Sequence, residues 1–291
     1  MALGPGSIAF TGYDADGTDN LAFVALSAIS NGTVIFFRDD EWQGTAFNTG
    51  ESSFSLTATA DVGAGSIVTL SNIGSGTLTV NTGSTAFVVS ANRGLSGSDE
   101  IVYAYIGTDE NTPTSFLSAV ANLSLTSGAV LTNTGLTVGS NALQFGVGID
   151  VAAFTGSRGD QADFASYASI LNTAGNWITQ DGSGDQDKDT VAPDVPFSTT
   201  AFTLSASEAQ DVSIAAGSVT VSQLEGNAGT TAYTFTVQRT GGTTGDVTVN
   251  AKVASAQADS GDFAGAPSLP ITLTGTIAAG AGESGERNIT S

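Results

Sequence analysis

The sequence has no cysteine and no histidine among its 291 residues. The first absence excludes disulfides and thiol nucleophiles, and the second excludes a Ser-His-Asp triad and imidazole metal ligands. A Ser–Lys dyad would need Lys188 or Lys252, the only lysines. Lys188 lies in an Asp-rich stretch that keeps it charged, and Lys252 falls in a strand pattern that faces outward, so neither is a desolvated base. We therefore expect that the chain is not an enzyme.

Positive charge is scarce, because seven basic residues stand against 28 acidic ones and the net charge is −21. So few scattered basic residues cannot form a basic patch, which argues against nucleic acid and anionic membranes as partners. No run of 18 apolar residues is present, so no membrane insertion is expected. Residues 1–7 lack the charged and apolar regions of a signal peptide. Such an acidic chain repels itself, and divalent cations would offset that repulsion.

The residues that are abundant predict an all-β protein. Hydrophobic residues make up 40% of the chain and glycine contributes 37 residues, which suits a folded core with many turns. Short apolar runs bounded by turn residues predict strands. They lie at Ile8–Phe10, Leu21–Leu26, Thr33–Phe37, Ser53–Thr59, Ser66–Ser71, Leu78–Val80, Ala86–Ser90, Glu100–Ile106, Ala129–Asn133, Ala142–Val147 and Thr200–Leu204.

Two short helices are expected to interrupt these strands. The first opens at Thr112-Pro113, an N-cap followed by proline, and places Phe116, Val120 and Leu123 on one face. The second starts near Asp160 and carries Phe164, Tyr167 and Leu171 at similar spacing. Each would cover an open end of a sheet. Together with the strands, they predict a β-sandwich domain over residues 1–205.

A second domain is indicated after a polar linker at residues 206–217. Apolar residues alternate strictly within three segments of residues 218–291, namely Val219/Val221, Tyr233/Phe235/Val237 and Val247/Val249/Ala251/Val253. A further strand is expected at Ile271–Ile277. This period of two is typical of a half-buried antiparallel sheet.

Two acidic loops are candidates for Ca²⁺ binding. Asp14, Asp16 and Asp19 surround Gly17, and carboxylates at such spacing around a glycine suit a Ca²⁺ loop. A second stretch holds four carboxylates in nine residues, at Asp181, Asp185, Asp187 and Asp189. The alternative stays open that both are ordinary solvated turns, because Asp and Gly are favoured in turns generally and the first loop lacks the final Glu of an EF-hand.

A third acidic cluster lies beside an aromatic residue. Asp39, Asp40, Glu41 and Glu51 flank Trp42, and paired carboxylates could in principle hydrolyse glycosides. A glycosidase using Glu41 and Glu51 would require an open cleft between them. It is a weaker interpretation than metal binding or solvent exposure.

The segment from Val219 resembles a Calx-β domain, an immunoglobulin-like sandwich. The resemblance rests on Val221–Asn227, Tyr233–Thr240, Asp259–Phe263 and Ala278–Glu283. It implies Ca²⁺ at one end of the sandwich, with Glu225, Asp259 and Asp262 as ligands. The last strand of the family pattern is missing before Ser291. We therefore expect either an edge that pairs with another chain or a fragment of a longer protein.

The first segment resembles the N-terminal module of RTX-type bacterial surface proteins. The matching residues are Ile8–Gly17, Phe23–Leu26, Gly32–Phe36, Glu41-Trp42 and Asn176-Trp177. The resemblance implies type I secretion, whose signal is C-terminal, and a secreted or cell-surface location. The Gly-Gly-x-Gly-x-Asp repeats of RTX proteins are not present.

Composition and resemblance together predict an extracellular, calcium-stabilised structural protein of a surface layer, matrix or adhesive assembly. Its partners would be further copies of the chain, other surface proteins or polysaccharide. The alternative is a carbohydrate-binding or targeting module of a larger secreted hydrolase. An exposed aromatic face at Trp42 or Trp177 would favour the alternative, and a self-complementary strand edge in the second domain would favour assembly.

Overall fold

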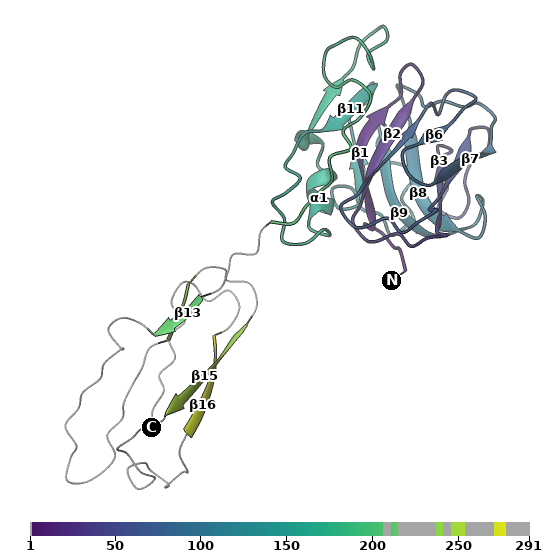
Figure 1. The fold of residues 1–291 in the computed structure, drawn as a ribbon. Helices are drawn as coiled ribbons and strands as arrows, with labels where there is room; N and C mark the ends of the chain where they lie inside the picture. The colour runs from purple at the N-terminus through teal and green to yellow at the C-terminus, as the bar shows by residue number, and fades with distance from the viewer. Residues whose placement is uncertain (1, 206–210, 215–236, 241–245, 254–270, 278–291) are drawn as a thin grey trace, which may run out of the picture. The chain divides into compact units, whose positions relative to one another are not determined.

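The computed structural model divides the chain into two compact units, residues 1–205 and 206–291. It describes residues 2–205, 211–214, 237–240, 246–253 and 271–277 (Figure 1). Strands dominate the first unit and make up nearly all of the described residues of the second, which confirms the predicted all-β class. Among the described residues, no helix has the length and apolar character needed to cross a membrane.

The first unit is a sandwich of two six-stranded sheets. The first sheet has the order β12-β11-β1-β2-β5-β6 and the second has the order β10-β9-β8-β3-β4-β7. Neighbouring strands are antiparallel except for β10 and β9. The strands are β1 Ile8–Asp14, β2 Asn20–Ala25, β3 Val34–Arg38, β4 Ser53–Thr57, β5 Ile67–Ser71, β6 Thr79–Val80, β7 Ser84–Val89, β8 Ile101–Gly107, β9 Pro113–Ala121, β10 Ala142–Gln144, β11 Val151–Phe154 and β12 Trp177–Gln180.

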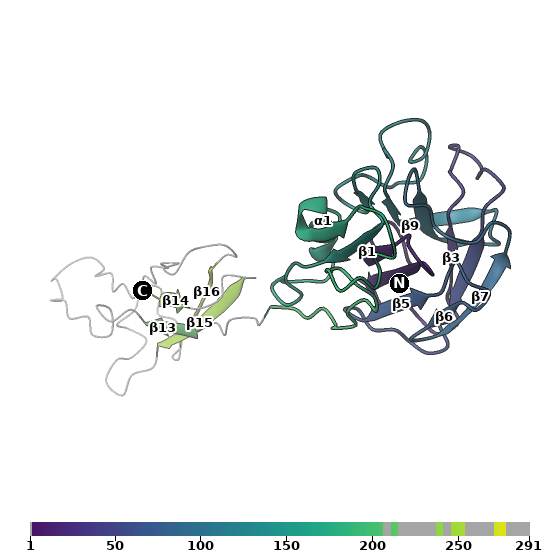
Figure 2. The same ribbon diagram turned by 90° about the horizontal axis from the view of Figure 1, so that it is seen from above.

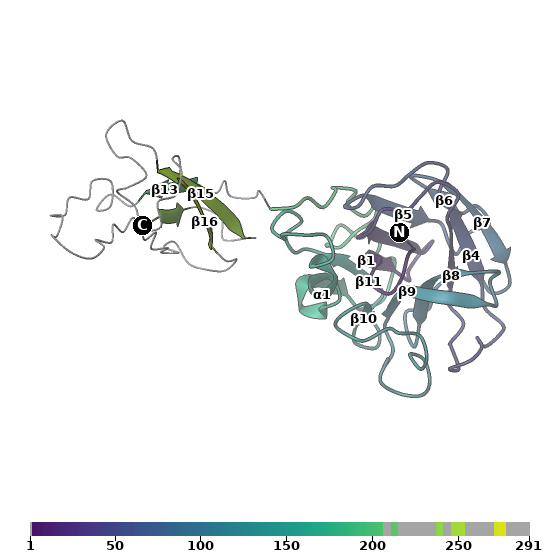
Figure 3. The same cartoon turned by 90° about the horizontal axis from the view of Figure 1, so that it is seen from below.

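The main core lies between the two sheets. Aromatic side chains from both layers meet there. The centre of the Phe37 ring lies 5.8 Å from that of Phe23 and 5.2 Å from that of Phe54. Seen from above in Figure 2 and from below in Figure 3, the strands surround this common interior. A short helix, α1 (Tyr167–Leu171), lies at its margin, with Tyr167 and Leu171 buried. A 3₁₀ turn at Ala174–Asn176 leads into β12.

A second apolar cluster covers the outer face of the second sheet. It contains Trp42, Tyr103, Tyr105 and Phe116, with Phe47 packed against them. Loops therefore bury the outer face of β8 and β9, while the main core buries the inner face. This burial on both faces explains the error at residues 112–123, where a helix was predicted and β9 is found. Both faces of β9 are apolar, so its sequence shows no alternation and mimics the spacing of a helix.

Other predicted elements are also corrected. Residues 129–133 form turns and not a strand, and residues 200–204 make only an isolated bridge, between Gln161 and Leu204. Strands β11 and β12 were not predicted. The second expected helix is confirmed only as the short α1. In each case pairing or packing with distant segments, and not local preference, decides the conformation.

The second unit contains two described strand pairs. Strand β13 (Asp211–Ile214) pairs with β14 (Val237–Thr240), so part of the expected linker is a strand. Strand β15 (Val247–Val253) pairs antiparallel with β16 (Ile271–Ile277). Both strands were predicted, the first from its alternating apolar residues. The strands expected at Val219/Val221 and Tyr233/Phe235 lie outside the described residues. The immunoglobulin-like arrangement stays a prediction.

Gly12 provides a test of packing on the outer face of the first sheet. Strand β1 has a register shift between Phe10 and Gly12, and the Phe197 ring lies directly over the Gly12 backbone. A Cβ at Gly12 would lie 2.5 Å from this ring. We expect Gly12→Ala to lower the free energy of unfolding by about 1–3 kcal/mol, measured with denaturant. The control is Gly76→Ala, whose added Cβ meets no heavy atom within 4 Å; equal losses in the two variants would contradict this packing.

Candidate metal centre

Strand pairing brings the acidic loops to one end of the sandwich. Strand β1 ends at Asp14, opposite the start of β11 at Val151, which in turn lies opposite the end of β12 at Gln180. The loops that follow β1 and β12 therefore leave the first sheet at the same end. The second sheet contributes to this end as well, because the Leu95 N–H donates to Asp19 Oδ2 at 3.0 Å. We call the loops 15–19, 39–52, 90–100, 145–150 and 181–189 the acidic end.

The two predicted Ca²⁺ loops contact each other at the acidic end. The Gln186 N–H donates to Asp16 Oδ2 at 2.6 Å, across 170 positions of sequence. The Asp187 carboxylate packs against Gly17, where an added Cβ would lie 3.0–3.2 Å from its two oxygens and Cγ. Gly17 is needed here for its φ of 63° and for this close approach. The sequence identified both loops, but their contact depends on the fold.

Two carboxyl groups of the first loop are buried. Asp14 is 0% exposed, and its oxygens accept from the Asp16 N–H and the Asn20 amide. Asp19 is 6% exposed and adopts a left-handed backbone, with φ of 55°. Burial raises the pKa of each carboxyl to about 7. In the described part of the chain, neither carboxyl forms an ion pair.

Of these buried carboxyls, Asp187 alone has a positive partner within the described part of the chain. Its buried carboxylate accepts from Lys188 Nζ at 2.7 and 2.8 Å. The Lys188 side chain is 53% exposed, so it can turn away into solvent. Its hydrogen bonds to Asp187 raise the pKa of Lys188, which therefore stays charged. Among the described residues, Lys188 pairs with Asp187 and Asp185, whereas the buried Asp14 and Asp19 have no charge partner.

The remaining predicted ligands are distributed differently. Asp185 lies 4.0 Å from Lys188 and belongs to the same group. Asp181 packs toward Gly148, and Asp189 accepts from the Val191 N–H, so these two exposed residues point elsewhere. Glu225, Asp259 and Asp262 lie outside the described residues. Within those residues, no three acidic side chains are already arranged as metal ligands.

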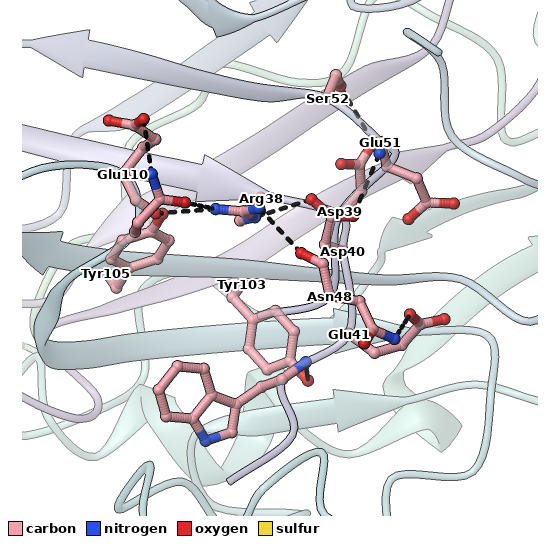
Figure 4. Close-up of polar contacts among 12 residues, drawn as sticks. Arg38, Asp39, Asp40, Glu41, Asn48, Glu51, Ser52, Tyr103, Tyr105 and Glu110 are labelled. Atoms are coloured by element: carbon pink, nitrogen blue, oxygen red, sulfur yellow. Dashed lines mark hydrogen bonds and ion pairs between the residues drawn. The ribbon is translucent and has the colours of Figure 1, made fainter. Parts of the chain in front are cut away.

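The third acidic cluster is organised around Arg38. Its guanidinium pairs with Asp40 at 2.9 Å and donates to Asn111 and to the main-chain oxygens of Asn48 and Glu110 (Figure 4). Trp42 is only 6% exposed, and its indole N–H donates to the Thr132 carbonyl. Glu41 accepts from the Asn48 amide. The tryptophan therefore belongs to the second apolar cluster and offers no surface platform.

Sequence reasoning missed Glu100 and Asp150. Glu100 is buried just before β8 and accepts from the Ser96 and Ile101 N–H groups. Burial raises its pKa to about 9. Asp150 lies against Gly97 and also has a raised pKa, chiefly through burial. Asp150 is a single acidic residue beside an apolar strand, and Glu100 follows Asp99 at a turn before an apolar strand, so no metal-ligand pattern marks either residue.

No protein-family model, no curated protein and no solved structure matches this chain. The resemblances to RTX-type modules and Calx-β domains stay predictions. The site is therefore interpreted from its own geometry.

Proposed function

We propose that this chain is a non-enzymatic, calcium-stabilised structural protein of an extracellular surface layer, matrix or adhesive assembly. The observation that carries this proposal is the contact between the loop of Asp14, Asp16 and Asp19 and the loop of Asp185 and Asp187, where Lys188 is the only positive partner among the residues that the structure describes. The secreted location rests on the resemblance to RTX-type modules and is part of the proposal.

The donor set at this contact fits a hard divalent cation. All of its side-chain donors are carboxylate oxygens, the ligands that Ca²⁺ prefers. Lys188 Nζ already donates to Asp187, and this hydrogen bond, with smaller contributions from the charges of Asp185 and Asp14, raises the pKa of Lys188, so positive charge is favoured there. Bound Ca²⁺ would supply two positive charges in place of the lysine's one. Asp14, Asp19 and Asp187 would hold it after Lys188 turns away, and the two loops would be joined.

Calcium would act on both stability and association. An ion that binds the folded state alone stabilises it by about 2.7 kcal/mol at 100 times its Kd. Neutralising part of the −21 net charge would also reduce repulsion between chains. Both effects are expected to disappear when the ion is removed.

Light scattering and thermal unfolding during a Ca²⁺ titration test the proposal. We expect the melting temperature to rise by about 5–10 °C and the particle size to increase, with a chelator reversing both. Asp187→Asn should remove most of the thermal shift. Asp61→Asn, an exposed change of equal charge between β4 and β5, should retain it.

The two readouts separate the parts of the proposal. A rise in melting temperature without growth in particle size would contradict assembly and leave calcium with a structural role. No change in either would mean that the acidic loops are solvated turns. No observation favours the carbohydrate-binding alternative at the tryptophans, because Trp42 and Trp177 are 6% and 8% exposed.

A further inference from the structure

Strand β7 is an edge strand whose outer side has no pairing partner in the described part of the chain. The sheets of the first unit end at β12, β6, β10 and β7. Strand β6 has only two residues, and a bridge between Val138 and Ala142 covers β10. Strand β7 pairs with β4 on one side, and residues 84–90 form no other main-chain hydrogen bond with the described residues. Because alternate N–H and C=O groups of an antiparallel strand point away from its partner, β7 presents unpaired donors and acceptors.

The outward side chains of β7 are small or apolar. Side chains along this strand alternate between half-buried and exposed, and the half-buried Phe87 packs against the main core. The exposed ones are Ser84, Ala86 and Val88. Val88 is the extra residue of a β-bulge opposite Ser53 and Phe54, and it is 41% exposed. The bulge leaves residues 84–87 as a regular edge, and Figures 2 and 3 show β7 at the outer margin of the first unit.

Charge is distributed unevenly over the first unit. At the acidic end, a cavity of about 450 Å³ is lined by four acidic residues, namely Asp16, Asp19, Glu51 and Glu100. By contrast, residues 62–92, which contain β5, β6 and β7, hold no charged residue, and β4 holds none either. Strand β12, the remaining edge, leads directly into the acidic end at Asp181. In a chain with a net charge of −21, a second copy therefore meets the least repulsion at β7.

We propose that two copies of this chain pair antiparallel through β7, related by a two-fold axis, so that the second sheet continues from one copy into the other. Such pairing would satisfy the free main-chain groups of both strands. A two-fold axis places the same strand opposite itself, so any charge on it would face a like charge, and β7 has none. The exposed Val88 side chains would be partly covered. The dimer needs no Ca²⁺ and so goes beyond the calcium-dependent assembly proposed above.

Sedimentation velocity of the full chain in chelator tests the proposal, over roughly 1–300 µM protein, a range that covers weak and moderate dimers. We expect a reversible monomer–dimer equilibrium. Ala86→Glu and Val88→Glu should each weaken the dimer at least tenfold, because each places like charges across the two-fold axis. The control is Val147→Glu, which adds the same charge at a side chain that is 64% exposed and lies at the acidic end. It should dimerise like the parent.

Chemical cross-linking provides a second measurement, which does not depend on weakening the strand. The chain contains no cysteine, so Ala86→Cys introduces a single thiol at the centre of the regular edge. Side chains directly or diagonally opposite across a strand pair lie about 4.5–8 Å apart, within reach of a short bismaleimide. We expect Ala86→Cys to give a covalent dimer in chelator, whereas Val147→Cys should stay monomeric under the same conditions.

The outcomes separate this inference from the calcium proposal. A chain that stays monomeric throughout the concentration range would overturn the β7 dimer. So would a dimer that Ala86→Glu and Val88→Glu leave as stable as the control does, or equal cross-linking at residues 86 and 147. If the β7 dimer forms in chelator but Ca²⁺ changes neither melting temperature nor particle size, the dimer stands and the calcium proposal fails.

Discussion

Acidification from pH 8.5 to pH 5.5 in the presence of a chelator is expected to raise the melting temperature of the first unit. Four buried carboxyls have pKa values raised mainly by burial: about 7 for Asp14 and Asp19, about 8 for Asp39 and about 9 for Glu100. In the unfolded chain these groups titrate near pH 4. Between about pH 4 and pH 9 the folded state therefore binds more protons than the unfolded state.

The sign of the pH effect follows from this difference in bound protons. Stability falls with rising pH wherever the folded state binds more protons, so it rises as the pH is lowered through this window. Each pKa unit of difference corresponds to about 1.4 kcal/mol, and several kcal/mol are therefore at stake. For a unit of this size we expect an increase on the order of 10 °C. Trp42 and Trp177 both lie in the first unit, so tryptophan fluorescence reports its unfolding.

Asp19→Asn provides the matched variant for this experiment. Asparagine tolerates the left-handed backbone of residue 19 and can still accept from the Leu95 N–H. The variant should be more stable than the parent at pH 8.5 and should show a smaller dependence on pH. Saturating Ca²⁺ should also flatten the dependence, because it replaces protons as the source of compensation. A melting temperature that falls steadily from pH 8.5 to pH 5.5 would contradict the assignment of these buried carboxyls.

Arg38→Met is expected to lower the free energy of unfolding by about 3–5 kcal/mol. The Arg38 and Asp40 side chains are 4% and 3% exposed, so removing the arginine leaves a buried carboxylate without its charge partner. The carbonyls of Asn48 and Glu110 would lose donors as well, and the contact with the Phe47 ring would be lost. Denaturant unfolding in chelator measures the change.

Two comparisons make the Arg38 experiment specific. Arg93→Met removes an exposed arginine and should change stability by no more than about 0.5 kcal/mol. Adding Asp40→Leu to Arg38→Met should recover part of the loss, since the stranded charge is then absent. If Arg38→Met lowers the free energy of unfolding by less than about 1 kcal/mol, or if the double variant recovers none of the loss, then Arg38 does not compensate the buried charge of Asp40.

The strand predictions succeeded where one face of a strand differs from the other or where clear turns bound a short apolar run. Strand β15 follows the alternation of Val247, Val249, Ala251 and Val253. Strands β1 and β2 coincide with apolar runs that turn residues bound in the sequence. Strand β9 was assigned wrongly because the second apolar cluster buries its outer face. The covering loops come from residues around Trp42 and Leu125, and no local pattern reveals that they meet there.

Composition and local pattern determined the all-β class, most strands of the first unit and the two acidic loops, because strand periodicity and turn chemistry depend on neighbouring residues. Only the tertiary structure decided that Asp16 meets Gln186, that Trp42 is buried, and that Glu51 and Glu100 line the same cavity. The physical reason is that burial and charge proximity depend on which strands pair. Antiparallel pairing gathers at one end carboxylates that the sequence places up to about 170 residues apart.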